Sequence, residues 1–158
     1  AYATYVGCRI YNVRSAIAIA TIEQGHVFLF STLDSLRHPT IQFSVLPDLL
    51  RFADEDKIEF VHLKNEQRSN YSIKVGLRSF LILERELYDD MFFAYDFIIW
   101  RKDNLNNLLD FRRKYEKSII IIDGSNSQRN INILMAMEAN MPFLYLLKNN
   151  FAYVWVQE

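Results

Sequence analysis

The most constraining feature of this sequence is its last part, where short apolar runs alternate with helix-like segments. The runs Phe97 to Trp100, Ser118 to Ile122 and Phe143 to Leu147 are rich in β-branched and aromatic residues, which is typical of buried strands. Helices are predicted between them, from about Asp103 to Tyr115 and from about Gln128 to Asn140. This order predicts a β-α-β-α-β unit, in which helices flank a sheet.

Local signals support both helices and predict how the chain ends. Asp103 is a favourable N-cap for the first helix, and Asn140 followed by Pro142 ends the second. Beyond them, Lys148 to Asn150 predicts a turn, and residues Phe151 to Val156 alternate between aromatic and small apolar side chains. We therefore expect the chain to end as a β-hairpin.

The first part of the chain has mainly strand-like composition. Turn residues Glu23 to Gly25 separate two such runs and predict a hairpin. A short amphipathic helix is predicted between Pro47 and Asp54, with the proline in its first turn. An α/β fold in which strands come first is therefore expected. The strand-like runs are Tyr5 to Asn12, Ala16 to Ile22, Val27 to Phe30, Lys57 to Leu63 and Tyr71 to Leu83.

Size and composition limit the class of protein. With 158 residues, of which 51% are hydrophobic, the chain is long enough to bury a core, and residues 1–158 are predicted to form a single domain. The net charge of -1 gives no overall attraction to nucleic acid or an anionic membrane, so any such contact must be local. No apolar run approaches the ~20 residues that span a bilayer. The sequence starts without methionine, and we expect it to be excised from a longer protein.

Metal and cofactor chemistry has little support in the sequence. The histidines His26, His38 and His62 stand apart, with no His-x-His or His-Glu-x-x-His cluster around any of them. A single cysteine, Cys8, excludes an intrachain disulfide and a multi-thiolate metal site. We predict no metal ligands and no cofactor.

The segment Asp123, Gly124, Ser125 and Asn126 is the candidate ligand site. It follows a buried strand and precedes a helix, a position at which ligands often bind. The same residues also fit a purely structural interpretation: Gly124 makes the turn, Asn126 or Ser127 caps the next helix, and Asp123 accepts hydrogen bonds from the loop backbone. The Gly-x-Ser-x-Gly motif of many serine hydrolases is absent, so no catalytic residue is predicted.

A basic segment is the candidate nucleic-acid contact. Between Arg101 and Lys117 there are six Lys or Arg residues and three acidic residues. Cations at the end of a helix also interact favourably with its dipole, and acidic residues just upstream carry the opposite charge, so the indication is weak. The predicted contacts are Arg101, Lys102, Arg112, Arg113 and Lys114.

The order of segments resembles a known family. The closing stretch, Ile119 to Ser127, a helix, Met141 to Tyr145 and then a run to Val156, resembles the soluble carboxy-terminal domain of ComEC-type competence proteins, in their shorter variants. These proteins are inner-membrane channels for DNA uptake, and this domain is related to metallo-β-lactamase folds. The resemblance implies trimmed metallo-β-lactamase-like sheets with flanking helices.

Four earlier segments follow the hydrophobic pattern of the family but lack its ligand residues. The family's Gly and Asp residues are missing from Ile10 to Ile19 and Val27 to Thr32. Ser79 to Glu84 stands where a strand ends in Gly-Asp, and Tyr95 to Trp100 stands before the family's His-His-Gly-Ser loop. The resemblance therefore implies a degenerate, metal-free version of the fold.

These observations lead to one expected function and two alternatives. The resemblance implies a non-catalytic, periplasmic domain of a membrane DNA-uptake channel, which guides single-stranded DNA or docks a partner. Its partners would be single-stranded DNA and the transmembrane part of the same protein. The alternatives are a metal-dependent hydrolase or nuclease with an atypical site around Asp123, Ser125 and Asn126, and a structural oligomerisation module that uses exposed aromatic residues.

Overall fold

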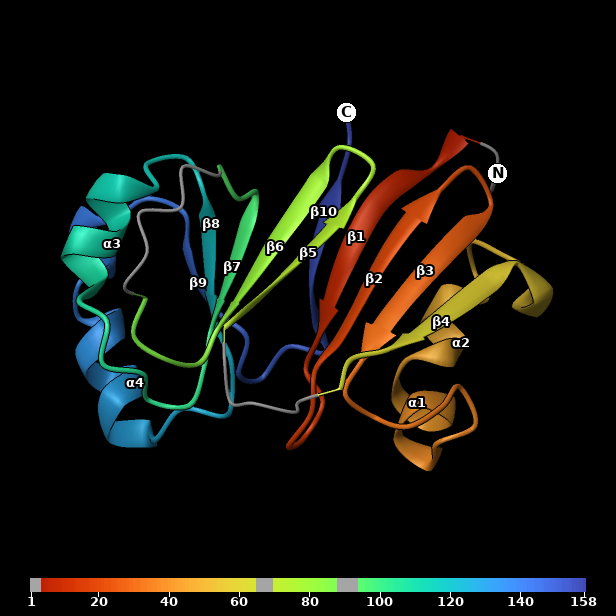
Figure 1. Cartoon of the computed structure of the whole chain (residues 1–158), viewed down its shortest axis with the longest axis horizontal. Helices are drawn as coiled ribbons and strands as arrows, with labels where there is room; N and C mark the ends of the chain where they lie inside the picture. Colours follow the sequence, from red (N-terminus) through yellow and green to blue (C-terminus); the bar gives the residue numbers. More distant parts are fainter. Residues whose placement is uncertain (1–3, 65–69, 88–93) are drawn as a thin grey trace. The chain divides into compact units, whose positions relative to one another are not determined.

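A computed structural model describes residues 4–64, 70–87 and 94–158 of the chain. The chain divides into two compact units, one formed by Ala1–Asn65 with Asn149–Glu158 and the other by Glu66–Lys148. Each unit contains one five-stranded sheet with mixed strand directions (Figure 1). The predicted α/β class is therefore confirmed, while the metallo-β-lactamase-like topology and the single domain over 1–158 stay predictions.

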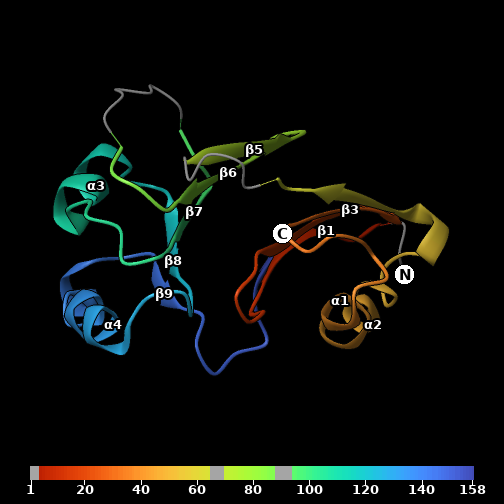
Figure 2. The same cartoon turned by 60° about the horizontal axis from the view of Figure 1, so that its bottom comes forward.

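The sheet of the first unit has the strand order β10-β1-β2-β3-β4. Gln24 and Gly25 have φ values of 51° and 82°, as a two-residue type I′ turn requires, so β2 and β3 form the predicted hairpin. β3 and β4 are parallel, and two helices on one face of the sheet lie between them in the chain (Figure 2). The elements are β1 (Val6–Tyr11), β2 (Ala18–Glu23), β3 (His26–Ser31), α1 (Pro39–Ser44), α2 (Leu46–Leu49), the 3-10 helix η2 (Glu55–Lys57), β4 (Ile58–His62) and β10 (Ala152–Val156).

The two short helices of this unit cover its core. Ile41, Val45 and Leu49 are fully buried and belong to one cluster with Ala20 and Leu29 of the sheet. α2 has its proline in the first turn, as predicted, but it is shorter than the predicted helix. α1 was not predicted, because it buries only Ile41 and shows no amphipathic repeat.

The second unit contains the predicted β-α-β-α-β arrangement. Its strand order is β5-β6-β7-β8-β9, with β6 to β9 parallel and β5 antiparallel. Trp100 of β7 meets Phe111 of α3 edge-on, with ring centroids 5.6 Å apart, and Ile131 of α4 joins the same buried cluster. The elements are β5 (Tyr71–Val75), β6 (Arg78–Leu83), β7 (Phe97–Trp100), α3 (Leu108–Lys114), β8 (Ile119–Ile122), α4 (Gln128–Met135), the 3-10 helix η3 (Glu138–Asn140) and β9 (Leu144–Leu146).

The predicted terminal hairpin is wrong. β9 pairs in parallel with β8, whereas β10 pairs antiparallel with β1 in the sheet of the first unit. A hairpin signal reports only that a turn is possible, and here the edge of β1 provides the partner for β10. Gly7 allows the close approach, since a Cβ atom there would collide with the carbonyl of Trp155.

The predicted start of the helix at Asp103 is also wrong. α3 begins at Leu108, and its N-cap is Asn107, whose side chain accepts a hydrogen bond of 3.1 Å from the Asp110 amide. Lys102 and Asp103 have φ values of 56° and 51°, which are incompatible with a right-handed helix. The Asp103 carboxylate instead accepts a hydrogen bond from the Ser127 amide.

Candidate functional site

Three charged residues lie side by side at the carboxyl ends of parallel strands. Glu84, Arg101 and Asp123 directly follow β6, β7 and β8. The last residues of these strands are in register, with Leu83 opposite Trp100 and Trp100 opposite Ile122. The sheet therefore places the three side chains on one edge, which we call the carboxyl edge.

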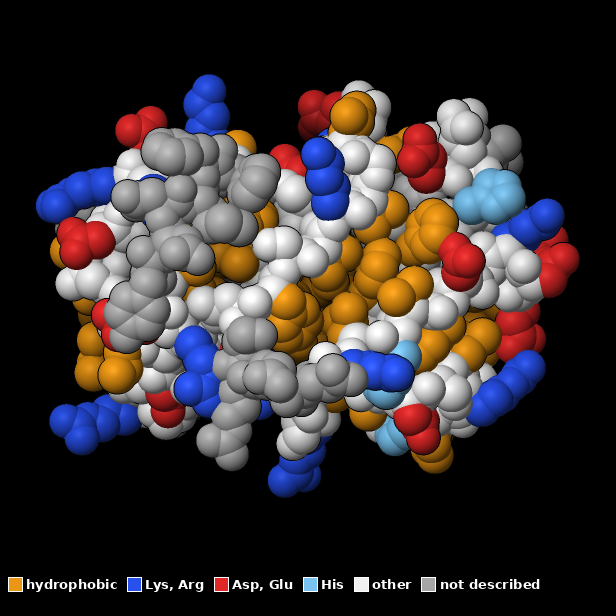
Figure 3. Space-filling view, viewed as in Figure 1, with side chains coloured by type: hydrophobic (Ala, Val, Ile, Leu, Met, Phe, Trp, Pro, Cys, Tyr) orange, Lys and Arg blue, Asp and Glu red, His pale blue; other side chains and the backbone are white. Residues whose placement is uncertain are grey.

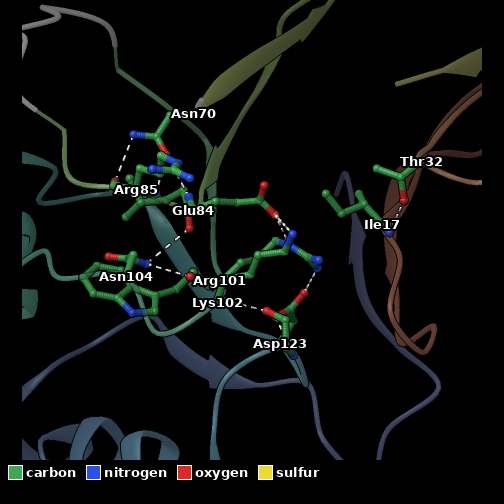
Figure 4. A network of polar contacts seen from close by, with 12 residues as sticks. Ile17, Thr32, Asn70, Glu84, Arg85, Arg101, Lys102, Asn104 and Asp123 are labelled. Atoms are coloured by element: carbon green, nitrogen blue, oxygen red, sulfur yellow. Dashed lines mark hydrogen bonds and ion pairs between the residues drawn. The ribbon is translucent and has the colours of Figure 1, made fainter. Parts of the chain in front are cut away.

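The Arg101 guanidinium connects the two carboxylates (Figure 4). Its Nε donates to Glu84 Oε2 at 2.9 Å, and its Nη1 donates to Asp123 Oδ2. The side chains of Glu84, Arg101 and Asp123 are only 5%, 5% and 9% exposed. Because little water reaches them, each charge depends on the others for its stabilisation.

Burial also affects two ionisable neighbours in this network. It raises the pKa of the Asp123 carboxyl above its usual value, and Arg101 and hydrogen bonds from Ser125 oppose this shift. Burial and the negative charge of Glu84 raise the pKa of Tyr71 to about 12. Within the described part of the chain, the Tyr71 hydroxyl is buried without a hydrogen-bond partner. Glu84, Arg101, Asp123 and the Tyr71 hydroxyl thus lie in a poorly hydrated environment, beneath the exposed residues of the edge.

Reciprocal hydrogen bonds join the loop after β7 to the loop after β8. The amides of Lys102 and Asp103 donate to Ser125 Oγ at 2.8 Å and to Asn126 Oδ1 at 2.9 Å. Ser125 Oγ donates to Asp123 Oδ1, while Asn126 Nδ2 donates to the carbonyls of Trp100 and Asp123. These bonds hold Lys102 and Asp103 in the left-handed region, which is unfavourable for residues with a side chain.

The structural interpretation of the Asp123 loop is confirmed. Gly124 lies in a turn and is exposed, and Ser127 caps α4 by accepting from the Asn130 amide at 3.2 Å. Asp123 accepts from the Ser125 amide at 3.0 Å. The ligand-binding interpretation of Asp123, Gly124, Ser125 and Asn126 stays a prediction.

The structure separates the predicted basic contacts into two groups. Arg101 and Lys102 lie at the carboxyl edge. α3 runs back along the sheet, so Arg112, Arg113 and Lys114 lie at its other edge, where Arg112 donates to the carbonyls of Ser118 and Phe143. We call this the amino edge, since β8 and β9 begin there.

Each of these five cations is either buried or in contact with another group of the chain. Arg101 is buried, and Arg112 also donates to the carbonyls of Tyr115 and Glu116. Arg113 forms an exposed ion pair of 3.3 Å with Asp110, and Lys114 lies over the ring of Tyr115. Lys102 has a half-exposed side chain, with Nζ 3.8 Å from Glu84.

The residues at the carboxyl edge do not fit a catalytic metal ion. In residues 4–64, 70–87 and 94–158, no group of three or more His, Cys, Asp or Glu residues is suited to hold one. The two carboxylates that converge there already bind the Arg101 cation. His26, His38 and His62 belong to the first unit, so none of them follows a strand of the second sheet.

A family model identifies the chain. The model described as the ComEC C-terminal domain matches residues 8–156, which is nearly the whole sequence. The chain belongs to this family. No curated protein and no solved structure matches the chain significantly. Membership in the ComEC family connects the chain with DNA uptake in competence and with a membrane protein, as the resemblance implied. Among the described residues of this ComEC domain, no helix has the length and apolar character needed to cross a bilayer.

Sequence reasoning missed several residues of the carboxyl edge. From the sequence, Glu84 is predicted only as the end of a strand-like run and as one of several upstream acidic residues, and Lys148 only as part of a turn; Arg85 and Arg129 carry no prediction. Arg85, Arg129 and Lys148 come shortly after β6, β8 and β9 and are exposed. The rule that ligands bind beyond the carboxyl ends of parallel strands could have drawn attention to all four.

Proposed function

We propose that this chain is a non-catalytic, periplasmic domain of a membrane DNA-uptake channel and that it guides single-stranded DNA. The observation that carries the non-catalytic role is the position of Arg101 between Glu84 and Asp123. A buried guanidinium that neutralises two carboxylates leaves them poorly suited to bind a metal ion or to transfer protons. The partners in this proposal are single-stranded DNA and the transmembrane part of the same protein.

The guiding role is supported by exposed cations at both edges of the second sheet. Lys102, Arg85, Arg113 and Lys114 are all exposed, while the chain as a whole is nearly neutral. Local positive charge of this kind attracts phosphates without sequence preference. It allows weak, reversible binding, which suits a strand that must move past the domain.

The test is binding of a labelled single-stranded oligonucleotide, measured by fluorescence anisotropy across a salt series with Mg²⁺ or Mn²⁺ present. We expect binding that weakens with salt and no shorter products on a gel. Metal-dependent cleavage would overturn the non-catalytic role, and absence of binding at low salt would overturn the guiding role. Titration calorimetry with Mn²⁺ and Zn²⁺ provides an independent check, in which tight binding would contradict the proposed role of Arg101.

The alternative hydrolase would depend on Asp123, Ser125 and Asn126. In the structure, Ser125 Oγ donates to the same Asp123 carboxylate that Arg101 binds, and the Asn126 amide is bonded to two carbonyls. Such hydrogen bonds are typical of a rigid loop rather than of an activated nucleophile. A cleavage activity that Ser125→Ala abolishes would favour the hydrolase.

A structural oligomerisation module is the other alternative, and aromatic residues on the face of the first sheet opposite its helices favour it. Phe28 is 38% exposed and stacks with Phe30, with ring centroids 6.4 Å apart. Figure 3 shows hydrophobic side chains gathered over the strands of this sheet. Light scattering tests self-association: a mass that rises with concentration and falls in Phe28→Glu would favour an oligomerisation module.

A further inference from the structure

We infer that the carboxyl edge of the second sheet is the surface that contacts the phosphates of single-stranded DNA, an inference that rests on the proposed guiding role. Four exposed cations carry it: Arg85, Lys102, Arg129 and Lys148. Each comes from a different loop or helix start, after β6, β7, β8 and β9 respectively. None of the four except Lys102 belonged to the contacts predicted from the sequence.

Hydrogen bonds and close charge contacts connect these four positions into one continuous edge. Arg85 follows Glu84, whose carboxylate lies 3.8 Å from Lys102 Nζ. The Lys102 amide donates to Ser125 Oγ, two residues before the cap of α4. Arg129 lies in the first turn of α4 next to Gln128, whose side chain accepts a hydrogen bond from Lys148 Nζ. Three strand spacings separate β6 from β9, so the edge extends over about 14 Å.

The carboxylates of the same edge are directed to internal partners. Glu84 and Asp123 are buried on Arg101, and the half-buried Asp103 accepts from the Ser127 amide. Glu86 is the one exposed acidic residue in the segments 84–87, 101–107, 123–129 and 147–150, all of which the structure describes. The exposed charge of the edge is therefore positive although its total charge is close to neutral, which explains why composition did not reveal it.

The amino edge is a weaker candidate for phosphate binding. Arg112 is occupied by four backbone carbonyls, and Arg113 pairs with Asp110. Glu116, which is exposed, lies between Lys114 and Lys117 in the sequence. Opposite charges alternate there, so a row of phosphates would meet repulsion as well as attraction.

The experiment compares two variants that each lose four positive charges. The edge variant is Arg85→Gln/Lys102→Gln/Arg129→Gln/Lys148→Gln, and its matched control is Lys74→Gln/Arg113→Gln/Lys114→Gln/Lys117→Gln. Binding of a labelled oligothymidylate is measured across a salt series for both and for the unchanged chain. We expect the edge variant to lose affinity by about tenfold or more at low salt. Four phosphate contacts contribute about -3 to the slope of log binding constant against log salt concentration, and the edge variant should lose this contribution. The control variant should lose clearly less affinity than the edge variant, because its cations alternate with acidic residues.

The outcomes separate this inference from the guiding role. If the unchanged chain binds and the control loses affinity while the edge variant does not, the contact surface is the amino edge; the inference is then wrong and the guiding role stands. If the unchanged chain does not bind DNA, the guiding role itself fails. Circular dichroism checks folding, and the milder pair Arg85→Gln/Arg129→Gln, with Arg113→Gln/Lys117→Gln as its control, decides the question if the quadruple variant does not fold.

Discussion

The two units each contain a buried arginine, but in different surroundings. In the first unit, Arg9 Nε donates to Asp48 of α2 at 3.0 Å, and its guanidinium lies 4.9 Å from the ring centre of Phe52. In the second unit, Arg101 is held between two carboxylates.

The partners of each arginine indicate its role. Asp48 has two further partners, since Tyr11 donates to it at 2.7 Å and Arg51 at 3.1 Å. Arg9 thus connects β1 to α2 within a network in which Asp48 keeps other donors. Arg101 is the chief counter-charge of two acidic residues beneath an edge that carries exposed cations. The first network stabilises the fold, and the second also determines the charge that this edge presents.

The largest expected effect is the loss of Arg101. Arg101→Met leaves Glu84 and Asp123 buried without their main counter-charge, which should lower the free energy of unfolding by about 3–5 kcal/mol. Arg9→Met should cost less, because Asp48 keeps Tyr11 and Arg51.

Urea unfolding followed by tryptophan fluorescence measures both losses. Trp100 reports on the second unit and Trp155 on the first, so each arginine is replaced in a background in which the other unit's tryptophan is phenylalanine. An equal or larger loss for Arg9→Met would remove the proposed distinction between the two networks.

A smaller change is expected when the whole network is neutralised. Glu84→Gln/Arg101→Met/Asp123→Asn should recover about 2 kcal/mol relative to Arg101→Met, because no unpaired charge stays buried. The Asp123→Asn substitution keeps a side-chain oxygen that can accept from the Ser125 amide, so the loop retains that hydrogen bond. Urea unfolding of both variants gives the difference. A triple variant no more stable than Arg101→Met would show that packing, rather than charge, accounts for the loss.

The N-caps of α3 and α4 should each contribute about 1 kcal/mol to the free energy of unfolding. Asn107→Ala and Ser127→Ala each remove a side chain that accepts from a helix amide. The Ser127 amide also donates a hydrogen bond to the Asp103 carboxylate. This bond uses the backbone, so Ser127→Ala does not remove it. Both variants should therefore lose similar stability in thermal unfolding. A much larger loss for Asn107→Ala would show that the start of α3 depends on more than its cap.

The smallest expected effect is a pH dependence at Asp123. Burial raises the pKa of this carboxyl in the folded chain above its unfolded value of about 3.9. Between the two values the folded chain holds a proton that the unfolded chain has lost. The contribution of the carboxyl to stability is therefore greatest at low pH and is lost as pH rises through the folded pKa.

The measurement is the difference in unfolding free energy between the unchanged chain and Asp123→Asn across mildly acidic to neutral pH. The free energy of unfolding of the unchanged chain should rise relative to that of Asp123→Asn as the solution becomes more acidic. A relative loss on acidification would mean that the attraction of Arg101 outweighs burial and holds the carboxyl ionised.

Local patterns in the sequence were enough to predict most of the secondary structure elements of this protein. The isoleucine run of β8, Ser127 as a cap and the Gln24-Gly25 turn act within a few residues, so their patterns predicted the β-α-β-α-β unit, one hairpin and the turn at Gly124. The order of segments also sufficed to suggest the family.

Contacts between segments that are distant in the sequence could not be predicted in this way, because they depend on how the chain folds in three dimensions. β10 completes the sheet of β1 rather than pairing with β9, because a strand edge far away in the sequence accepts it. Glu84, Arg101 and Asp123 are 17 and 22 residues apart, and nothing local in the sequence indicates that they converge. Strand register brings them together, and burial makes their pairing necessary, since a charge removed from water needs a counter-charge.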